Sequence, residues 1–321
     1  MLGIDGYLSP RMLRLACRLT SDHAFEVAAE RFWELLKVRV DGETLRRHCE
    51  AEGAAIAEWV RHQPEAAEPF HAAAGDGEVQ VDAGKVNTTS GWRDLKMVVF
   101  AKRPRGEAAT PDQWDKRQLP RPTARFALAD IEGIETFRRD WRVWADLLGL
   151  GSGLDLSVLG DGAEWIWNAA TVQFPGSRQV LDVFHALESV GKAAASLYGK
   201  DTPEAEVSFA AGRAAVLAEG WDGVCQWVAG ELAQKDNDAR RQVLDELITY
   251  TSKHTKRMGY RGRLAEGRSI GSGLVEGTIK TMGLRMKARG ARWIERNAEN
   301  MAAQVGLSHS SSWDIYWALA L

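Results

Sequence analysis

Glu78-Val79-Gln80-Val81-Asp82-Ala83-Gly84-Lys85-Val86-Asn87-Thr88 is the stretch that decides the fold, because apolar residues alternate with polar ones along it. Alternation with a period of two predicts a β-strand that ends near the carboxylate of Asp82. Thr89-Ser90-Gly91 predicts a turn, and residues 92–102 predict a second strand that pairs with the first as an antiparallel hairpin. Residues 125–130 predict a third strand.

Two more strands are predicted further along the chain, where helical segments separate them. Residues 155–160 and 178–184 are short apolar runs, and residues 131–150 and 163–174 have helical periodicity. This order of elements predicts a mixed five-stranded sheet with helices on both faces, in which the first and fourth strands can be neighbours. The predicted fold class is therefore α/β, with a ribonuclease H-like arrangement.

The remaining segments are predicted to be mainly helical. Asp41 is an expected N-cap of a helix that carries Arg46 and Arg47 near its start. This helix and the one before it form either a hairpin that only packs or a helix-turn-helix that enters the DNA major groove. The predicted divisions are an N-terminal helical region (1–76) ending in a linker (64–77), an α/β core (77–200), an all-helical insertion (201–263), the end of the core with a basic helix (264–300) and a C-terminal tail (301–321).

Composition indicates a globular protein of about two domains. The 321 residues are 45% hydrophobic and 26% charged, with a net charge of −3. No apolar run is long enough for a membrane span, and the N-terminus does not resemble a secretory signal. Cys17, Cys49 and Cys225 are widely spaced and are expected to be reduced thiols. We therefore expect a cytoplasmic protein.

Three acidic residues lie in local settings that suit a divalent metal ion. Asp82 lies on the first predicted strand, Asp161 follows the fourth between two glycines, and Glu276 lies where the loop Gly271-Ser272-Gly273 becomes a helix. Carboxylates supply the oxygen ligands that Mg²⁺ prefers. The three residues are far apart in the sequence, so only the tertiary fold could bring them together.

Positive charge is concentrated near Glu276. Between residues 251 and 293 eleven basic residues face only Glu266 and Glu276: Lys253, Lys256, Arg257, Arg261, Arg263, Arg268, Lys280, Arg285, Lys287, Arg289 and Arg292. Such a segment is either a solvated surface or a surface that contacts phosphates. The recurrence of Lys280, Arg285, Lys287, Arg289 and Arg292 predicts one basic face on the helix of Glu276, and Trp293 is a candidate for stacking on an unpaired base.

The chain resembles bacterial DDE insertion-sequence transposases, most closely the Kra group, over residues 3–300. The resemblance rests on five ordered stretches: Gln80–Thr88 with Gly91-Trp92-Arg93, Gly160–Asn168, Phe174-Pro175-Gly176, Val180–His185, and Ile270–Gly277 with Arg285–Trp293. Longer members of the family have additional sequence before residue 1, which implies that a DNA-end-binding part is missing here. The sequence after Asn300 departs from the family pattern.

The resemblance implies a DNA transposase that cleaves and joins DNA strands. Asp82, Asp161 and Glu276 would be its catalytic triad and would bind two Mg²⁺ ions, with Mn²⁺ as a substitute. Asp182 and His185 match the Asp/Cys-x-x-His pair that follows the second aspartate in related transposases and in Mutator-like enzymes, so His185 is a further candidate active-site residue. Element ends and target DNA would be the partners of a homo-oligomer, in a bacterial cytoplasm and at the nucleoid when bound. The alternatives are a truncated remnant that binds DNA without transposing and a ribonuclease H-like nuclease.

Overall fold

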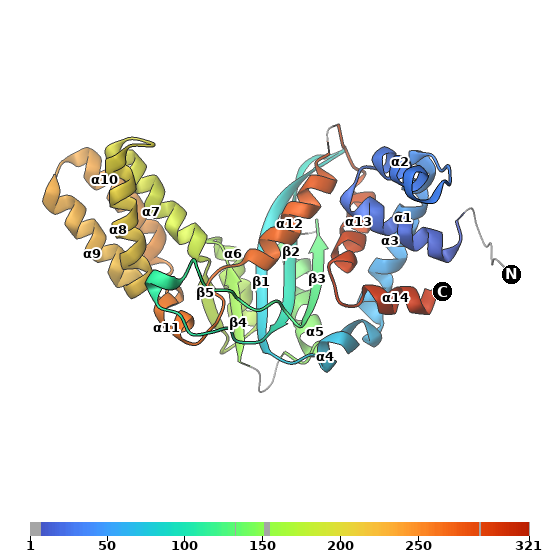
Figure 1. Ribbon diagram of the computed structural model, residues 1–321, viewed down its shortest axis with the longest axis horizontal. Helices are drawn as coiled ribbons and strands as arrows, with labels where there is room; N and C mark the ends of the chain where they lie inside the picture. Colours follow the sequence, from blue (N-terminus) through green and yellow to red (C-terminus); the bar gives the residue numbers. More distant parts are fainter. Residues whose placement is uncertain (1–7, 132, 151–154, 289, 321) are drawn as a thin grey trace. The chain divides into compact units, whose positions relative to one another are not determined.

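The computed structural model describes residues 8–131, 133–150, 155–288 and 290–320 (Figure 1). The chain is a mixed α/β protein whose five strands have the sheet order β3-β2-β1-β4-β5, with helices on both sides. This arrangement is consistent with a ribonuclease H-like fold. Two compact units can be distinguished, and each is described by itself below. Unit 1 comprises Met1–Lys102, Pro122–Leu154 and Gly273–Leu321, and unit 2 comprises Arg103–Arg121 and Asp155–Ser272.

The first three strands lie close to the residues predicted for them. They are β1 (Asp76–Thr88), β2 (Gly91–Arg103) and β3 (Ala124–Asp130). Strands β2 and β3 are antiparallel, in a register that pairs Lys96 with Asp130 and Lys102 with Ala124. The edge of β3 is covered, because Ser310 and Ser311 accept hydrogen bonds from the backbone N–H groups of Ala127 and Arg125.

Helices make up the rest of unit 1, and side chains cap the starts of two of them, α1 by Ser9 and α3 by Asp41. They are α1 (Pro10–Asp22), α2 (Phe25–Leu36), α3 (Gly42–His62), α4 (Glu68–Ala72), α5 (Ile134–Leu147), α12 (Gly273–Met286), α13 (Glu295–Ser308) and α14 (Trp313–Ala320), with the 3-10 turn η1 (Pro64–Ala67). The expected N-cap is confirmed, since Asp41 accepts a hydrogen bond of 2.8 Å from the Thr44 N–H.

Two predictions about irregular segments are wrong. Residues 64–77 were expected to be a linker, but η1 and α4 occupy most of them because Pro64 and Pro69 stand at first-turn positions that tolerate proline. Residues 301–321 were expected to be a tail, but the last part of α13 and all of α14 lie in them, and α13 packs against α3 and β3. The contact with β3 is close: a Cβ on Gly306 would lie 2.9 Å from the Ala127 carbonyl oxygen.

Unit 2 contains the parallel pair β4 (Leu156–Gly160) and β5 (Arg178–Leu181) together with a helical segment. Its helices are α6 (Glu164–Gln173), α7 (Val183–Tyr198), α8 (Pro203–Glu219), α9 (Trp221–Gln234), α10 (Asp238–Ser252) and α11 (Tyr260–Ala265), with the 3-10 turns η2 (Pro111–Gln113) and η3 (Thr255–Arg257). Residues 203–265 thus contain α8, α9, α10, η3 and α11, joined by short connections. The fifth strand is shorter than predicted, because Asp182 begins α7.

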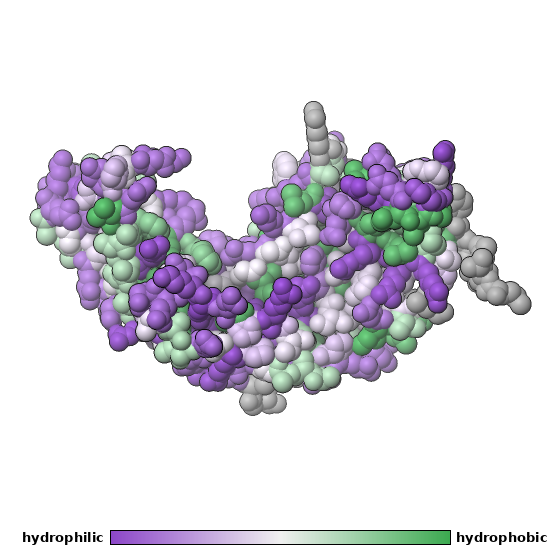
Figure 2. Space-filling model, in the orientation of Figure 1, coloured by the Kyte–Doolittle hydropathy of each residue, from purple (hydrophilic) through white to green (hydrophobic). Residues whose placement is uncertain are grey.

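The described helices and the drawn surface of the protein are both largely polar. Within the described ranges, none of the helices combines the length and the hydrophobicity needed to cross a bilayer. Hydrophilic residues are spread over the whole face drawn in Figure 2, and hydrophobic ones appear as small groups.

Candidate metal centre

Asp82 lies within β1 and not at its end, since the strand continues to Thr88. Its side chain is half-buried, and its Oδ1 accepts a hydrogen bond of 2.7 Å from the Ala83 N–H. Because side chains alternate between the faces of a strand, Gln80, Asp82 and Gly84 share one face. The contacts of Gln80 and Gly84 therefore show which element packs against the face of β1 that carries Asp82.

Helix α12 packs along this face of β1 and carries Glu276 in its first turn. Gln80 Oε1 accepts hydrogen bonds from the N–H groups of Leu274 (3.0 Å) and Val275 (3.3 Å). Further along, a Cβ on Gly84 would lie 3.8 Å from Ile279 Cδ1. Asp82 and Glu276 consequently occupy facing stretches of β1 and α12 within unit 1.

Asp161 and Asp182 stand at the carboxyl ends of the two parallel strands of unit 2. Gly160 pairs with Leu181, so the residues that follow them leave the same edge of the pair. The Asp182 N–H donates to the Gly160 carbonyl over 2.8 Å. In α/β folds, ligands are bound at this edge of parallel strands.

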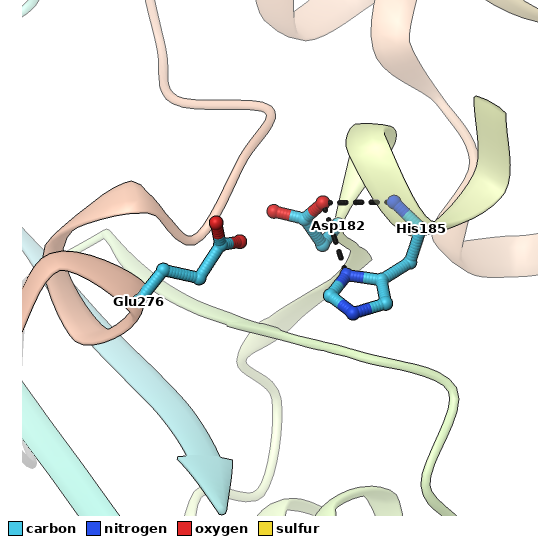
Figure 3. Close-up of side chains that lie close together, drawn as sticks. All are labelled: Asp182, His185 and Glu276. Atoms are coloured by element: carbon cyan, nitrogen blue, oxygen red, sulfur yellow. Dashed lines mark hydrogen bonds and ion pairs between the residues drawn. The ribbon is translucent and has the colours of Figure 1, made fainter. Parts of the chain in front are cut away.

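Asp182 is a buried carboxylate that connects the end of β5 with the first turn of α7 and with Ser272 through hydrogen bonds. As the N-cap of α7 it accepts from the N–H groups of Phe184 (2.7 Å) and His185 (3.1 Å), and it also accepts from the N–H and hydroxyl of Ser272. The His185 Nδ1 lies 3.3 Å from its Oδ1 (Figure 3). Burial raises the pKa of Asp182, but the bonds from His185 and Ser272 outweigh it and hold the pKa below its ordinary value. Asp182 is therefore ionised and orients His185, whose side chain is 36% exposed.

The surroundings of Asp161 include residues that the sequence did not identify. A Cβ on Gly162 would lie 2.4 Å from the Tyr250 ring, so Gly162 allows α10 to approach the Asp161 turn. Burial, together with the charges of Asp161 and Asp182, raises the pKa of Tyr250 to about 12. Its hydroxyl is therefore a proton-bearing group next to the carboxylates at neutral pH. Asp161 itself is half-buried and accepts from the Ala163 N–H over 2.7 Å.

The predicted basic helix is shorter than expected, since α12 ends at Met286. Lys280 is exposed on α12, and Lys287 and Arg292 are exposed beyond it. Arg292 donates to the carbonyls of Thr88 (3.3 Å) and Thr89 (3.0 Å), which leaves it on the surface beside the β1–β2 turn. Arg289 lies outside the described residues.

Arg285 and Trp293 lie in the interior of unit 1. Arg285 is 2% exposed, donates to the Thr20 carbonyl, and has its guanidinium 4.4 Å from the Phe25 ring and 5.0 Å from the Trp293 ring. Burial lowers its pKa to about 10. Trp293 is 7% exposed and donates from Nε1 to the Met286 carbonyl over 2.9 Å. Their contacts are those of core residues, so we do not include them in a DNA-contacting surface.

The helix with Arg46 and Arg47 has contacts typical of a packed hairpin. Arg46 forms ion pairs of 2.6 Å with both Glu43 and Glu50. The buried face of α3, which includes Leu45, Cys49 and Ile56, packs against α1, α2 and α13. These contacts therefore do not support a helix-turn-helix that reads DNA, and only the sequence pattern suggests one.

Comparison with known proteins adds no family assignment. A scan against models of protein families found no match, and no curated protein is significantly similar to the chain. A function must therefore be argued from the carboxylates, the histidine and the basic residues described above.

His254, between α10 and η3, is expected to make folding stability depend on pH. It is 2% exposed, and burial, with smaller effects of Arg257 and Lys253, lowers its pKa to about 4 from an ordinary value of 6.5. The unfolded chain binds the proton first, so stability is complete above pH 6.5 and is lost as the pH falls towards 4. Urea unfolding should show a loss of about 2 kcal/mol between pH 7 and pH 5 from this group. His254→Gln should remove that part, and an equal pH dependence in both proteins would contradict the assignment.

Proposed function

We propose that the protein is the DNA transposase of an insertion sequence, with Asp82, Asp161 and Glu276 as its catalytic carboxylates. The observation that carries the proposal is that α12 holds Glu276 along the same face of β1 as Asp82, through the contacts of Gln80 and Gly84. Asp161 directly follows a β4 strand that runs parallel to β5. Strand-borne aspartates and a helical glutamate are the elements of a ribonuclease H-like active site.

The donor set fits divalent cations. Carboxylate oxygens suit Mg²⁺ or Mn²⁺, and we propose that Asp82, Asp161 and Glu276 hold two such ions. Asp182, His185 and Glu276 are also of the ligand types that could hold a metal ion. Bound cations would activate a water or a DNA 3′-hydroxyl and stabilise the leaving oxygen. Asp182 would keep His185 oriented towards the reacting phosphate, and Tyr250 would remain protonated beside Asp161.

Phosphate contacts near Glu276 would come from exposed cations of unit 1. Lys280 lies one turn after Glu276 on α12, and Lys287 and Arg292 follow it. Such contacts would position DNA without specifying its sequence. Element ends and target DNA would then be the substrates of a homo-oligomer assembled on DNA.

The proposal is tested with supercoiled plasmid and a labelled oligonucleotide that ends in a 3′-hydroxyl. Nicking in Mg²⁺ or Mn²⁺ that stops with a chelator, together with transfer of the label into plasmid, is the expected result. Nicking without transfer would assign the protein to nucleases. Binding of DNA without either reaction, by a folded protein given the flanking DNA of its own coding region, would indicate a non-transposing remnant.

A further inference from the structure

A hollow with a volume of about 520 Å³ lies on unit 2. Its wall is formed by the start of β5, η3 and the beginning of α11. The cationic side chains in this wall are Arg178, Lys253, Lys256, Arg257 and Arg263, and none of the described residues that line it is acidic. A concave surface with positive charge only is suited to an anion.

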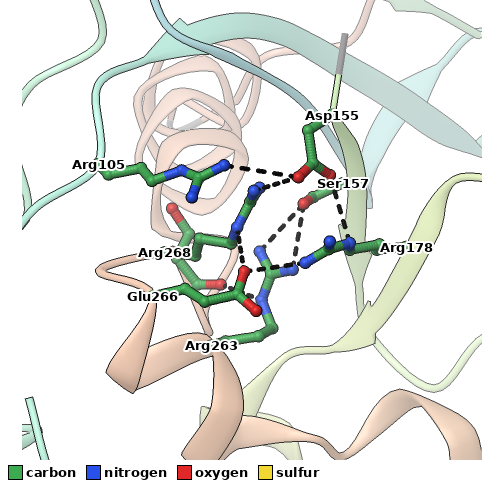
Figure 4. A network of polar contacts seen from close by, with 8 residues as sticks. Arg105, Asp155, Ser157, Arg178, Arg263, Glu266 and Arg268 are labelled. Atoms are coloured by element: carbon green, nitrogen blue, oxygen red, sulfur yellow. Dashed lines mark hydrogen bonds and ion pairs between the residues drawn. The ribbon is translucent and has the colours of Figure 1, made fainter. Parts of the chain in front are cut away.

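Two of these cations are already occupied by neighbouring groups (Figure 4). Arg178 pairs with Asp155 (3.3 Å) and Glu266 (2.9 Å), and Arg263 donates to Ser157 and to the Ser269 carbonyl. Lys253 and Lys256 differ, because both are exposed and neither has an ion pair within the part of the chain that the structure describes. The available charge of the hollow therefore comes mainly from these two lysines.

Arg257 and Ser177 add fixed polar groups to the same wall. The Arg257 Nε donates to Gln179 over 2.8 Å, its Nη1 donates to the Lys253 carbonyl over 2.8 Å, and its guanidinium lies 4.5 Å from the Trp167 ring. These contacts hold the guanidinium in one orientation, which reduces the entropy lost on binding an anion. The buried Ser177 Oγ has no hydrogen-bond partner among the described residues, so it is an unsatisfied polar group in this wall.

The hollow is connected to the Asp161 turn by α10. Tyr250 meets Gly162, and Lys253 follows Tyr250 by about one helical turn, roughly 4.5 Å along the axis. A strand whose phosphate lies at Asp161 would thus have neighbouring phosphates within reach of Lys253 and Lys256. We propose that this hollow binds consecutive backbone phosphates of DNA. The choice of DNA as the anion rests on the proposed function, whereas the anion site itself rests on the wall residues.

The test is equilibrium DNA binding by the full chain, measured without a catalytic metal ion so that cleavage plays no part. Fluorescence anisotropy with a labelled 30-base-pair duplex gives the affinity and its salt dependence. The variant is Lys253→Ala with Lys256→Ala, and the matched control is Lys200→Ala with Lys235→Ala, two exposed lysines of unit 2 outside the hollow. Thermal unfolding checks that each protein is folded, and Lys253→Arg with Lys256→Arg keeps the charge.

We expect the alanine pair to weaken binding about tenfold and to reduce the slope of log affinity against log salt by about two, one for each phosphate contact. The control and the arginine pair should bind like the wild type. Wild-type affinity and slope in the alanine pair would overturn the proposal. The proposal would also be overturned if the alanine pair bound DNA like the wild type but bound inorganic phosphate more weakly. That result would assign the hollow to a small anion. Lysine-dependent binding by a protein that never nicks DNA would leave this site standing while the proposed function fails.

Discussion

Asp161→Asn is expected to abolish metal-dependent nicking, with a fall in rate of roughly 10³-fold or more. The amide has the shape of the carboxylate but lacks the charge that would hold a divalent cation between protein and phosphate. Asp82→Asn and Glu276→Gln should have effects of the same size, because residues of one metal site act as a unit. Nicking of supercoiled plasmid in Mg²⁺ and in Mn²⁺ measures the loss.

The control for these variants is Asp222→Asn, which removes an exposed carboxylate from α9 in unit 2. It should nick like the wild type. All the variants should bind DNA at least as well as the wild type, since each removes one negative charge. If Asp161→Asn kept full activity while Asp182→Asn lost it, the metal would instead depend on the buried carboxylate that orients His185.

Arg285→Ala is expected to lower the free energy of unfolding by about 3 kcal/mol. The change leaves the Thr20 carbonyl without its donor, removes two cation–π contacts and opens a space between Phe25 and Trp293. Chemical denaturation measures this loss. Arg285→Met should recover part of it by filling the space.

Exposed lysines near Arg285 provide the control that separates a role in stability from a role in DNA binding. Lys280→Ala with Lys287→Ala should leave the free energy of unfolding within about 0.5 kcal/mol of the wild type but weaken DNA binding. If Arg285→Ala instead weakened DNA binding at full stability, Arg285 would be a phosphate contact and not a core residue.

The sequence predicted the strands better than it predicted the segments between them. Residues 77–81 of β1 and 97–103 of β2 are buried on both faces, and the β-branched and aromatic residues within these strands favour a strand locally. The end of β5 was wrong by three residues, because Val183 and Phe184 continue the apolar run while the side chain of Asp182 already caps a helix. The tail was also mispredicted, since α13 owes its order to packing against α3 and β3, which are far from it in sequence.

The site shows the same limit. Asp82, Asp161 and Glu276 are proposed as site residues from their local settings and from the family resemblance. Gln80, Tyr250 and Ser272 were not, because each acts on a residue remote in sequence. Arg285 had the sequence pattern of a surface cation, and only its contacts with Thr20, Phe25 and Trp293 reveal that it is buried. The spacing of charged residues along the sequence does not indicate whether a given side chain is buried.

The division of unit 1 into three chain segments affects how the protein is made. The ribosome releases α3 early, whereas α13 follows more than two hundred residues later, and Gly53 of α3 meets Asn300 of α13 only then. Until that moment the apolar face of α3 has no partner from α13. Unit 2, by contrast, has its full helical segment before the last part of unit 1 is synthesised. Nascent chains stalled before α13 should therefore bind chaperones through unit 1, while unit 2 already resists proteases.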